Sequence, residues 1–481
     1  MIERKPGIFI PTLYFAEGLP YTIVMMMSGV FFKSLGASNV FIGLTSFLSL
    51  PWILKFAWAP MVDYYASRRT WIVVAQVVLS LLIVAAASVA PTGFAVGAGV
   101  TVLFAIAIAS ATQDVAIDGY YLDVLSEKEK AFFVGVRNAA YKIAWLFGSG
   151  ALVALAGALG KTWGLGLGWA AAFGICAAVT AILAVFHNWY LPDPEKVVLA
   201  TDDACKQYSS SNGQSQEELG GSKSSSLTPQ GSEPVDTTSE TSTVAAPGGA
   251  DFYSALKTYF QQPGIVAIVT YILLFRLGDA FMLKQAPNFL LDPREAGGLG
   301  LSVSDVGIIN GTVGVLFLLC GGICGSWLVS RGGLRRWLWP TAIIQNSAIL
   351  LYFALAIFKP SLEWVYVVNS AEQFSYGLGV AAYTVFLLKT VRSRYKAANY
   401  ATATALMALG MMLPGAASGF LWQCMGYANF FLFSFLCSIP GIITIFYLPI
   451  WRADSVPEVA GQSGGFTSGI SKTGQVGSEN Q

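Results

Sequence analysis

Several ionisable side chains of this 481-residue chain lie inside long apolar segments. Glu17 lies roughly ten residues into the first of these segments, and Glu372 lies similarly deep in a later one, which at 1.5 Å per residue is near the middle of a bilayer. Arg276 and Asp279 share another segment, at positions i and i+3. Each such charge costs about 2.5–3.5 kcal/mol at the centre of a membrane helix, so we expect it to face protein or water. These side chains are the first candidates for a functional site.

Further charges lie near the ends of other apolar segments. Asp114 and Asp118 share one helix face, Lys55 follows a shorter apolar run, and Arg137 and Lys142 lie in the segment after the aspartates. Because only a short loop joins the two segments, Arg137 can neutralise either Asp114 or Asp118. The alternative for Asp118 and Arg137 is an ordinary ion-paired loop end in water.

Glu17 is followed by a helix breaker, Gly18-Leu19-Pro20. Pro20 has no N–H group, so the carbonyl of Ala16 is expected to lack its helical partner, which a membrane tolerates only beside a cavity or a neighbouring helix. Broken helices at this depth mark binding sites in many carriers. We therefore expect Glu17 to bind and release a proton. For Arg276 two roles stay open: it meets an anionic group of a solute, or it balances Asp279.

Aromatic side chains accompany these charges and supply the faces on which sugar rings or flat molecules stack. Packing within a helix bundle is the alternative role for each of them. The candidates for a solute cavity are Tyr14, Tyr21, Trp52, Phe275 and Tyr376.

The elements that position these residues follow from the composition. Hydrophobic residues make up 55% of the chain and charged residues only 11%, against roughly 25% charged in a soluble domain. A membrane crossing needs about 20 apolar helical residues. Blocks of that length predict an all-α membrane protein with twelve transmembrane helices in two six-helix halves. The predicted spans are 8–32, 38–59, 71–90, 94–116, 131–157, 166–191, 264–288, 304–329, 337–358, 362–388, 398–423 and 428–450.

Four regions follow from this pattern: an N-terminal half over 1–196, a linker over 197–250, a C-terminal half over 251–454 and a tail over 455–481. The linker and the tail are rich in Ser, Gly, Thr and Gln, which predicts disorder. Lys and Arg concentrate in the loops on the side of the two termini, so both termini and the linker are expected in the cytoplasm.

Composition also excludes several classes of function. The net charge of +1 provides no field for nucleic acid. His187 is the only histidine, and no His/Cys/Asp cluster stands in the loops, so we expect no catalytic residues, no metal and no cofactor. An integral membrane enzyme acting on a lipid-linked substrate is the alternative from another class. The partners expected are an organic solute, protons and the lipid bilayer, with the chain acting as a monomer.

One loop resembles a known signature. Residues 59–69 (APMVDYYASRR) are similar to the cytoplasmic motif of the major facilitator superfamily, with Ala in place of its usual Gly and Val329 where a second copy would carry an acid. The resemblance implies that Asp63, Arg68 and Arg69 form a cytoplasmic gate. It also implies that the first, fourth, seventh and tenth spans line a central cavity. Those spans hold Glu17, Asp114, Asp118, Arg276, Asp279 and Glu372.

Three further motifs, at 15–20 (FAEGLP), 51–60 (PWILKFAWAP) and 110–118 (SATQDVAID), resemble the bacterial muropeptide permease family and its acetyl-CoA transporter relatives. This resemblance implies proton-coupled import of a cell-wall solute by alternating access across the inner membrane. It adds Lys55 and Gln113 to the candidates for coupling or solute contact. A siderophore or an acyl-CoA is the alternative solute.

Overall fold

The computed structural model describes residues 5–192, 257–390 and 396–449, and every regular element in these ranges is a helix. The predicted linker (197–250) and tail (455–481) lie outside the described residues. The side chain of Asp63 also lies outside them, although its backbone belongs to a described helix.

The first group of helices covers residues 5–192, and several of its spans change helix type along their length. Its elements are α1 (Pro6–Thr22), η1 (Ile23–Met27), α2 (Ser28–Ser34), α3 (Asn39–Leu44), η2 (Thr45–Ser49), α4 (Leu50–Leu54), η3 (Lys55–Ala57), α5 (Ala59–Tyr65), α6 (Arg68–Val89), α7 (Ala95–Val124), α8 (Glu127–Trp145), η4 (Leu146–Leu152), α9 (Val153–Trp163) and α10 (Leu165–Tyr190).

The second group covers residues 257–390 and 396–449. Its elements are α13 (Ile265–Leu274), α14 (Leu277–Leu291), η5 (Arg294–Ala296), α15 (Val303–Val306), η6 (Gly307–Val313), α16 (Gly314–Ser347), α17 (Ile349–Phe358), α18 (Leu362–Lys389), α19 (Lys396–Thr444) and η7 (Ile445–Tyr447).

Within the described residues, nine helices are long and apolar enough to cross a membrane. Six of them lie before residue 193 and coincide with the spans predicted there. Two in the second group, Val303–Phe358 and Thr402–Tyr447, have 56 and 46 residues, although about 20 residues already span the hydrocarbon core. Glycines break both: Gly333 has a φ of 76° and Gly426 a φ of 70°, values that side chains with a Cβ rarely adopt.

The expected break at Gly18-Leu19-Pro20 is not formed, because α1 continues through Pro20 to Thr22. The helix changes into the π-helical segment η1 only at Ile23, three positions after Pro20. A proline removes one hydrogen bond, and a membrane helix tolerates that loss when neighbouring groups adjust.

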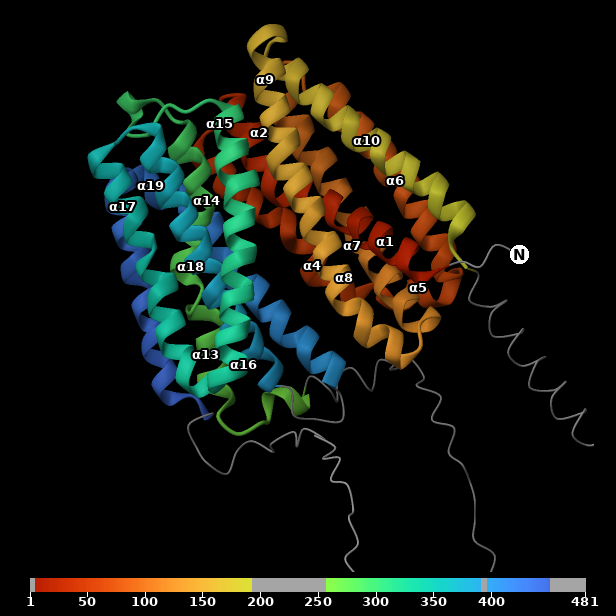
Figure 1. The fold of residues 1–481 in the computed structure, drawn as a ribbon. Coiled ribbons are helices and arrows are strands. Elements are labelled where there is room, and N and C mark those ends of the chain that lie inside the picture. The colour runs from red at the N-terminus through yellow and green to blue at the C-terminus, as the bar shows by residue number, and fades with distance from the viewer. Residues whose placement is uncertain (1–4, 193–256, 391–395, 450–481) are drawn as a thin grey trace, which may run out of the picture.

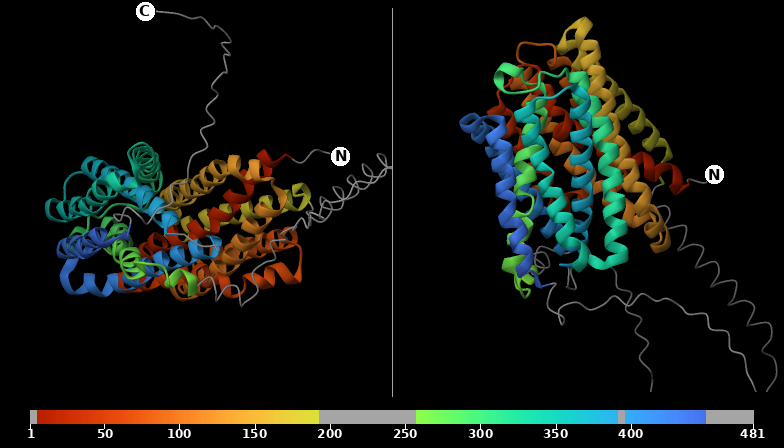
Figure 2. Two further views of the ribbon diagram at one scale, coloured as in Figure 1. Left: turned by 90° about the horizontal axis from the view of Figure 1, so that it is seen from below. Right: turned by 60° about the vertical axis from the view of Figure 1, so that its left-hand side comes forward.

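The two groups of helices lie side by side, as Figures 1 and 2 show from three directions, and we refer to them as the first and second bundles. At the upper end of Figure 1, α9 packs against α15 and η4 against η6; α3 packs against α19 elsewhere along the interface. Towards the lower end, α8 and α16 diverge. The bundles are therefore in contact mainly at one end, which we call the joined end.

The distribution of buried apolar side chains agrees with this arrangement. The largest apolar cluster contains side chains of both bundles, for example Phe31 and Trp169 together with Phe289 and Tyr352. Two smaller clusters each belong to one bundle alone. The bundles thus share a core at the joined end and have separate cores at the other.

Two glycines make the close approach of the bundles possible. A Cβ atom on Gly311 would lie 1.9 Å from the carbonyl oxygen of Ser149, and one on Gly419 would lie 2.2 Å from that of Asn39. Both distances are far below van der Waals contact. Only glycine fits where η4 meets η6 and where α3 meets α19.

Candidate functional site

Five predicted charges come together inside the first bundle, which we call the acidic cluster: Glu17 from α1, Lys55 from η3, Asp114 and Asp118 from α7, and Arg137 from α8. Lys55 Nζ lies 3.7 Å from Asp114 Oδ2, and Arg137 Nη1 lies 3.6 Å from Asp118 Oδ1. Of the two partners that the sequence allowed for Arg137, the structure selects Asp118.

No cation among the described residues lies within 4 Å of the Glu17 carboxylate. Its side chain is buried, and neither its Oε2 atom nor the Oδ1 atom of Asp114 has a hydrogen-bond partner within the described residues. All four other members of the cluster act on Glu17 electrostatically. Three carboxylates therefore face two cations, and a buried charge without compensation is costly. One proton shared among the carboxylates makes the cluster neutral.

The rings of Tyr14 and Tyr121 contact Arg137, one of the two cations of this cluster. The hydroxyl of Tyr14 donates to Asp118 Oδ1 at 3.1 Å. The guanidinium carbon of Arg137 lies 4.6 Å from the ring centre of Tyr14 and 5.4 Å from that of Tyr121. Tyr14 is thus a support for the charges, a different role from the stacking face expected.

Two polar groups near the cluster also lack partners. Gln113 is fully buried, and neither of its amide atoms is hydrogen-bonded to another described residue. The indole nitrogen of Trp52 lies near Asp114 but makes no hydrogen bond of good geometry to a described residue. A buried polar group left unpaired costs about 1–3 kcal/mol, so these groups are suited to meet water or a solute.

A second polar cluster lies in the second bundle and contains Arg276, Asp279, Glu372, Tyr376 and Gln345. The pairing of Arg276 with Asp279 that the sequence allowed is not formed. Arg276 instead donates to the hydroxyl of Tyr376, and Asp279 accepts from the amide of Gln345. The i, i+3 spacing fails because the chain leaves helical geometry at Arg276, with φ −97° and ψ 9°.

Glu372 accepts a hydrogen bond of 2.9 Å from Gln373 and is buried. Phe275 is not part of this polar cluster: its ring stacks on Tyr383 with centres 5.1 Å apart, inside the apolar core of the second bundle. The expectation that Phe275 faces a solute cavity is therefore wrong, because its side chain is taken up by packing.

Between the two clusters lies a group of aromatic rings. Tyr21 stacks on Trp145 with ring centres 6.0 Å apart and planes 4° from parallel, and it meets Trp52 edge-on at 5.1 Å. Lys142 Nζ lies 3.3 Å from the ring centre of Trp145. Tyr21 is within electrostatic range of Asp114 in its own bundle and of Arg276 in the other.

The predicted cytoplasmic gate residues make contacts within the first bundle. Arg68 Nη1 lies 2.7 Å from Asp123 Oδ2 and donates to the carbonyl of Gly119, also at 2.7 Å. Arg69 donates to the carbonyl of Asn188. These bonds tie the start of α6 to α7 and α10.

A polar network that the sequence did not indicate joins the bundles at the joined end. Lys33 Nζ lies 2.5 Å from Asp292 Oδ1 and donates to Asn39 Oδ1 at 2.6 Å. The amide of Asn39 donates to the hydroxyl of Tyr427 at 2.8 Å, and that hydroxyl donates to Asp292 at 2.5 Å. We call these four residues the bridging network. Nothing in the sequence pairs them, since 253 positions separate Asn39 from Asp292.

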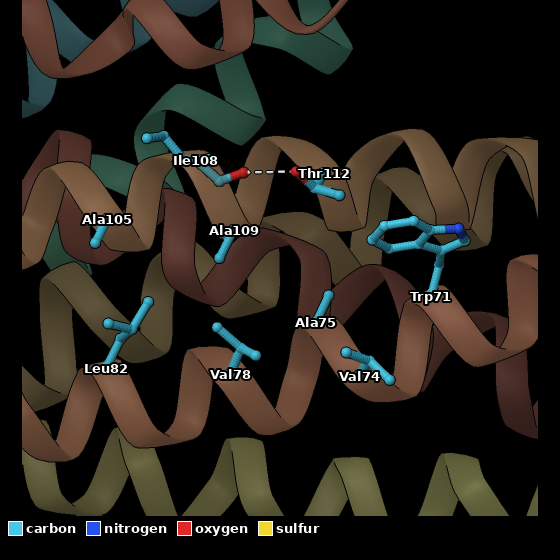
Figure 3. Close-up of a pocket in the computed structure, with 9 residues that line it drawn as sticks. All are labelled: Trp71, Val74, Ala75, Val78, Leu82, Ala105, Ile108, Ala109 and Thr112. Atoms are coloured by element: carbon cyan, nitrogen blue, oxygen red, sulfur yellow. Dashed lines mark hydrogen bonds between the residues drawn. The ribbon is translucent and has the colours of Figure 1, made fainter. Parts of the chain in front are cut away.

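A separate pocket of about 380 Å³ lies between α6 and α7, and Figure 3 shows its lining. The lining is almost entirely apolar: Trp71, Val74, Ala75, Val78, Leu82, Ala105, Ile108, Ala109 and Thr112. Thr112 stands two positions before Asp114, hence about 200° away around the helix. The pocket is thus on the other side of α7 from the acidic cluster, and its surface suits lipid chains.

Fold and site together define a class: an integral membrane protein of many helices, in which charged side chains within the spans face protein. Comparison with known proteins gives the family. Residues 12–419 match the Major Facilitator Superfamily, and the chain belongs to that superfamily of transporters.

The relatives agree with this assignment. The chain is 25% identical over 441 residues to the anhydromuropeptide permease of Escherichia coli (strain K12), covering 90% of this chain and 77% of the relative. Among solved structures it resembles the D-xylose-proton symporter (TM-score 0.62, 13% identity, 93% and 97% of the two chains). It also resembles the nucleoside transporter NupG (TM-score 0.60, 16% identity, 91% and 98% of the chains). At these identities the structural likenesses establish the fold.

Proposed function

We propose that this protein is a proton-coupled secondary transporter that imports an organic solute, a muropeptide, by alternating access. The similarity to an anhydromuropeptide permease over 90% of the chain supports the solute class. The observation that supports the coupling is the acidic cluster, in which three carboxylates, two of them buried, face two cations.

The proposed architecture has twelve spans in two six-helix halves. Dividing the two long helices at Gly333 and Gly426 and adding α18, which has 28 residues, extends the nine candidate spans of the described residues to twelve. The proposed halves are residues 1–196 and 251–454, with a cytoplasmic linker at 197–250 and a cytoplasmic tail at 455–481. One chain carries both halves, so the proposed transporter works as a monomer.

The proposed cycle rocks one bundle against the other. Lysines and arginines concentrate on the side of the termini, which the positive-inside rule assigns to the cytoplasm. With that orientation in the inner membrane, the joined end faces outward and this structure is the inward-open form. The outward-open form then requires the bridging network and the shared apolar core to separate.

Within this cycle Glu17 is the proposed proton carrier. Among the described residues no cation lies within 4 Å of its carboxylate and its Oε2 atom has no hydrogen-bond partner, whereas Asp114 and Asp118 each have a cation within 4 Å. Protonation of Glu17 from the outside neutralises the cluster, and release to the inside restores the charge. Asp279 and Glu372 form the corresponding polar site in the second bundle.

The test is uptake of a radiolabelled anhydromuramyl peptide into proteoliposomes with an inwardly directed proton gradient. We expect Glu17→Gln to abolish accumulation driven by the gradient while solute exchange at equal pH continues, because an amide cannot carry the proton. Glu363→Gln, at the exposed start of α18, is the matched control and should accumulate solute normally. Full gradient-driven uptake by Glu17→Gln would remove Glu17 from the mechanism.

A further inference from the structure

Two cations from different bundles lie within electrostatic range of each other: Lys142 of α8 and Arg276 at the start of α14. In the described part of the chain, no carboxylate lies within 4 Å of either. Asp279 acts on Arg276 from a distance, but its carboxylate is bound to Gln345. Like charges that lie within electrostatic range in a partly dehydrated space repel each other, so an anion from outside the chain fits between them.

Both cations lie close to aromatic rings. Lys142 Nζ lies 3.3 Å from the ring centre of Trp145. The guanidinium of Arg276 lies 5.2 Å from the ring centre of Tyr376 and donates to the Tyr376 hydroxyl and, at 3.7 Å, to the sulfur of Met407. A ring face attracts a cation, but it satisfies none of the three N–H donors of an ammonium in full. The Nε atom of Arg276 also has no acceptor among the described residues. Lys142 Nζ and Arg276 Nε are therefore available to donate hydrogen bonds to a bound anion.

The other cations between the helices are not available for this role. Lys55 and Arg137 already have Asp114 and Asp118 as partners. Lys284 donates to Thr45 at 2.8 Å, near the joined end. Lys142 and Arg276 differ from these cations in two ways. Lys142 has no anionic or hydrogen-bonded partner among the residues that the structure describes, and the two cations belong to different bundles.

We propose that Lys142 and Arg276 bind a carboxylate of the solute between them, with a ring of the solute against the stacked pair of Tyr21 and Trp145. This inference rests on the proposed function, since it requires the space between the bundles to be the path of the solute. The bound carboxylate replaces repulsion between the bundles with attraction from both sides. Solute binding would then favour closure of the bundles around it.

The experiment measures binding to the purified protein by calorimetry, with two pairs of probes. One pair is anhydro-N-acetylmuramyl-L-alanine, which carries a single carboxylate, and its carboxamide. The other is phenyl β-glucuronide and its carboxamide, which have a ring and the same difference in charge but no cell-wall structure. We expect the acid of a binding pair to bind roughly tenfold to hundredfold more tightly than the amide, as for a hydrogen bond to a charged group.

Variants of Lys142 test whether the preference for the acid over the amide comes from the proposed carboxylate site. Lys142→Gln should lower affinity for the acid to that for the amide, whereas Lys142→Arg should keep the preference. Lys142 is only half-buried, so the substitutions leave the core intact. Lys161→Gln, at the exposed end of α9, is the matched control and should behave as the wild type.

The outcomes separate this inference from the proposed function. If the muramyl acid and amide bind equally, or if Lys142→Gln keeps the preference, the carboxylate site is wrong while the muropeptide assignment stands. If only the glucuronide pair binds and its acid preference depends on Lys142, the site stands and the solute class is wrong. If neither acid binds, both are overturned.

Discussion

We predict that the bridging network stabilises the form of the protein in which the joined end is closed, relative to the form in which that end is open. In the structure Asp292 accepts from Lys33, Asn39 and Tyr427 at once, and the side chains of Lys33 and Asp292 are only 12% and 10% exposed. Asp292→Asn removes the ion pair and leaves the lysine buried without a counter-charge. Breaking a buried pair costs about 3–5 kcal/mol.

That cost falls on the form in which the joined end is closed. When the end opens, Lys33 reaches water and loses the penalty. A change of about 3 kcal/mol shifts the ratio of closed to open forms by roughly a hundredfold. We therefore expect Asp292→Asn to move the population towards the form that is open at this end.

The assay is a distance measurement by double electron–electron resonance between two spin labels, one in each bundle. The labels are attached at Thr162→Cys in α9 and Glu363→Cys in α18, in a protein whose natural cysteines are replaced. Asp292→Asn should add a population at longer distance. Glu295→Gln, an exposed change in the same loop, should leave the distribution as in the wild type. An unchanged distribution in folded Asp292→Asn would refute the view that the bridging network sets this balance.

Two further predictions concern the contact between bundles and the buried amide. Gly311→Ala should lower the melting temperature, because its Cβ would meet the carbonyl oxygen of Ser149 at 1.9 Å. Overpacking of this kind costs about 1–3 kcal/mol. The control is Gly174→Ala, whose Cβ would have no atom within 4 Å and which should leave the melting temperature unchanged. Gln113→Leu should leave the melting temperature near that of the wild type, because it removes polar atoms that have no partner among the described residues. It should lower solute uptake, because the amide is then lost as a contact for water or solute. Wild-type uptake by this variant would count against a role of Gln113 in transport.

The sequence was sufficient to single out the carboxylates of the acidic cluster because the physics behind that choice is local. A carboxylate such as Glu17 in the middle of an apolar segment is expensive unless protein or water receives it. That argument needs no knowledge of the fold. It singled out Glu17, Asp114 and Asp118 as candidates, and the structure places them beside Arg137 and beside Lys55, which the family resemblance added.

Contacts that depend on how the bundles meet could not be predicted in this way. Lys33 lies in the last turn of α2 and Asp292 directly follows α14, far away in the chain, and a charge at a helix end is ordinarily solvated. The pairing of Arg276 with Asp279 failed for a different reason, since it assumed a regular helix at a position where the backbone leaves helical geometry. Trp145 was missed although a signal existed: it follows Lys142 by three positions and so shares its helix face.

The shared apolar cluster at the joined end sets a barrier that charges alone would not. In the proposed cycle the bundles part there, and side chains such as Phe31 and Phe289, which this structure packs in one core, become exposed to water or lipid. Wetting apolar surface raises the heat capacity. If water reaches this cluster when the empty carrier returns, the activation enthalpy of that step varies with temperature. The Arrhenius plot of the turnover rate is then curved, and the curvature reports the exposure of the shared apolar cluster.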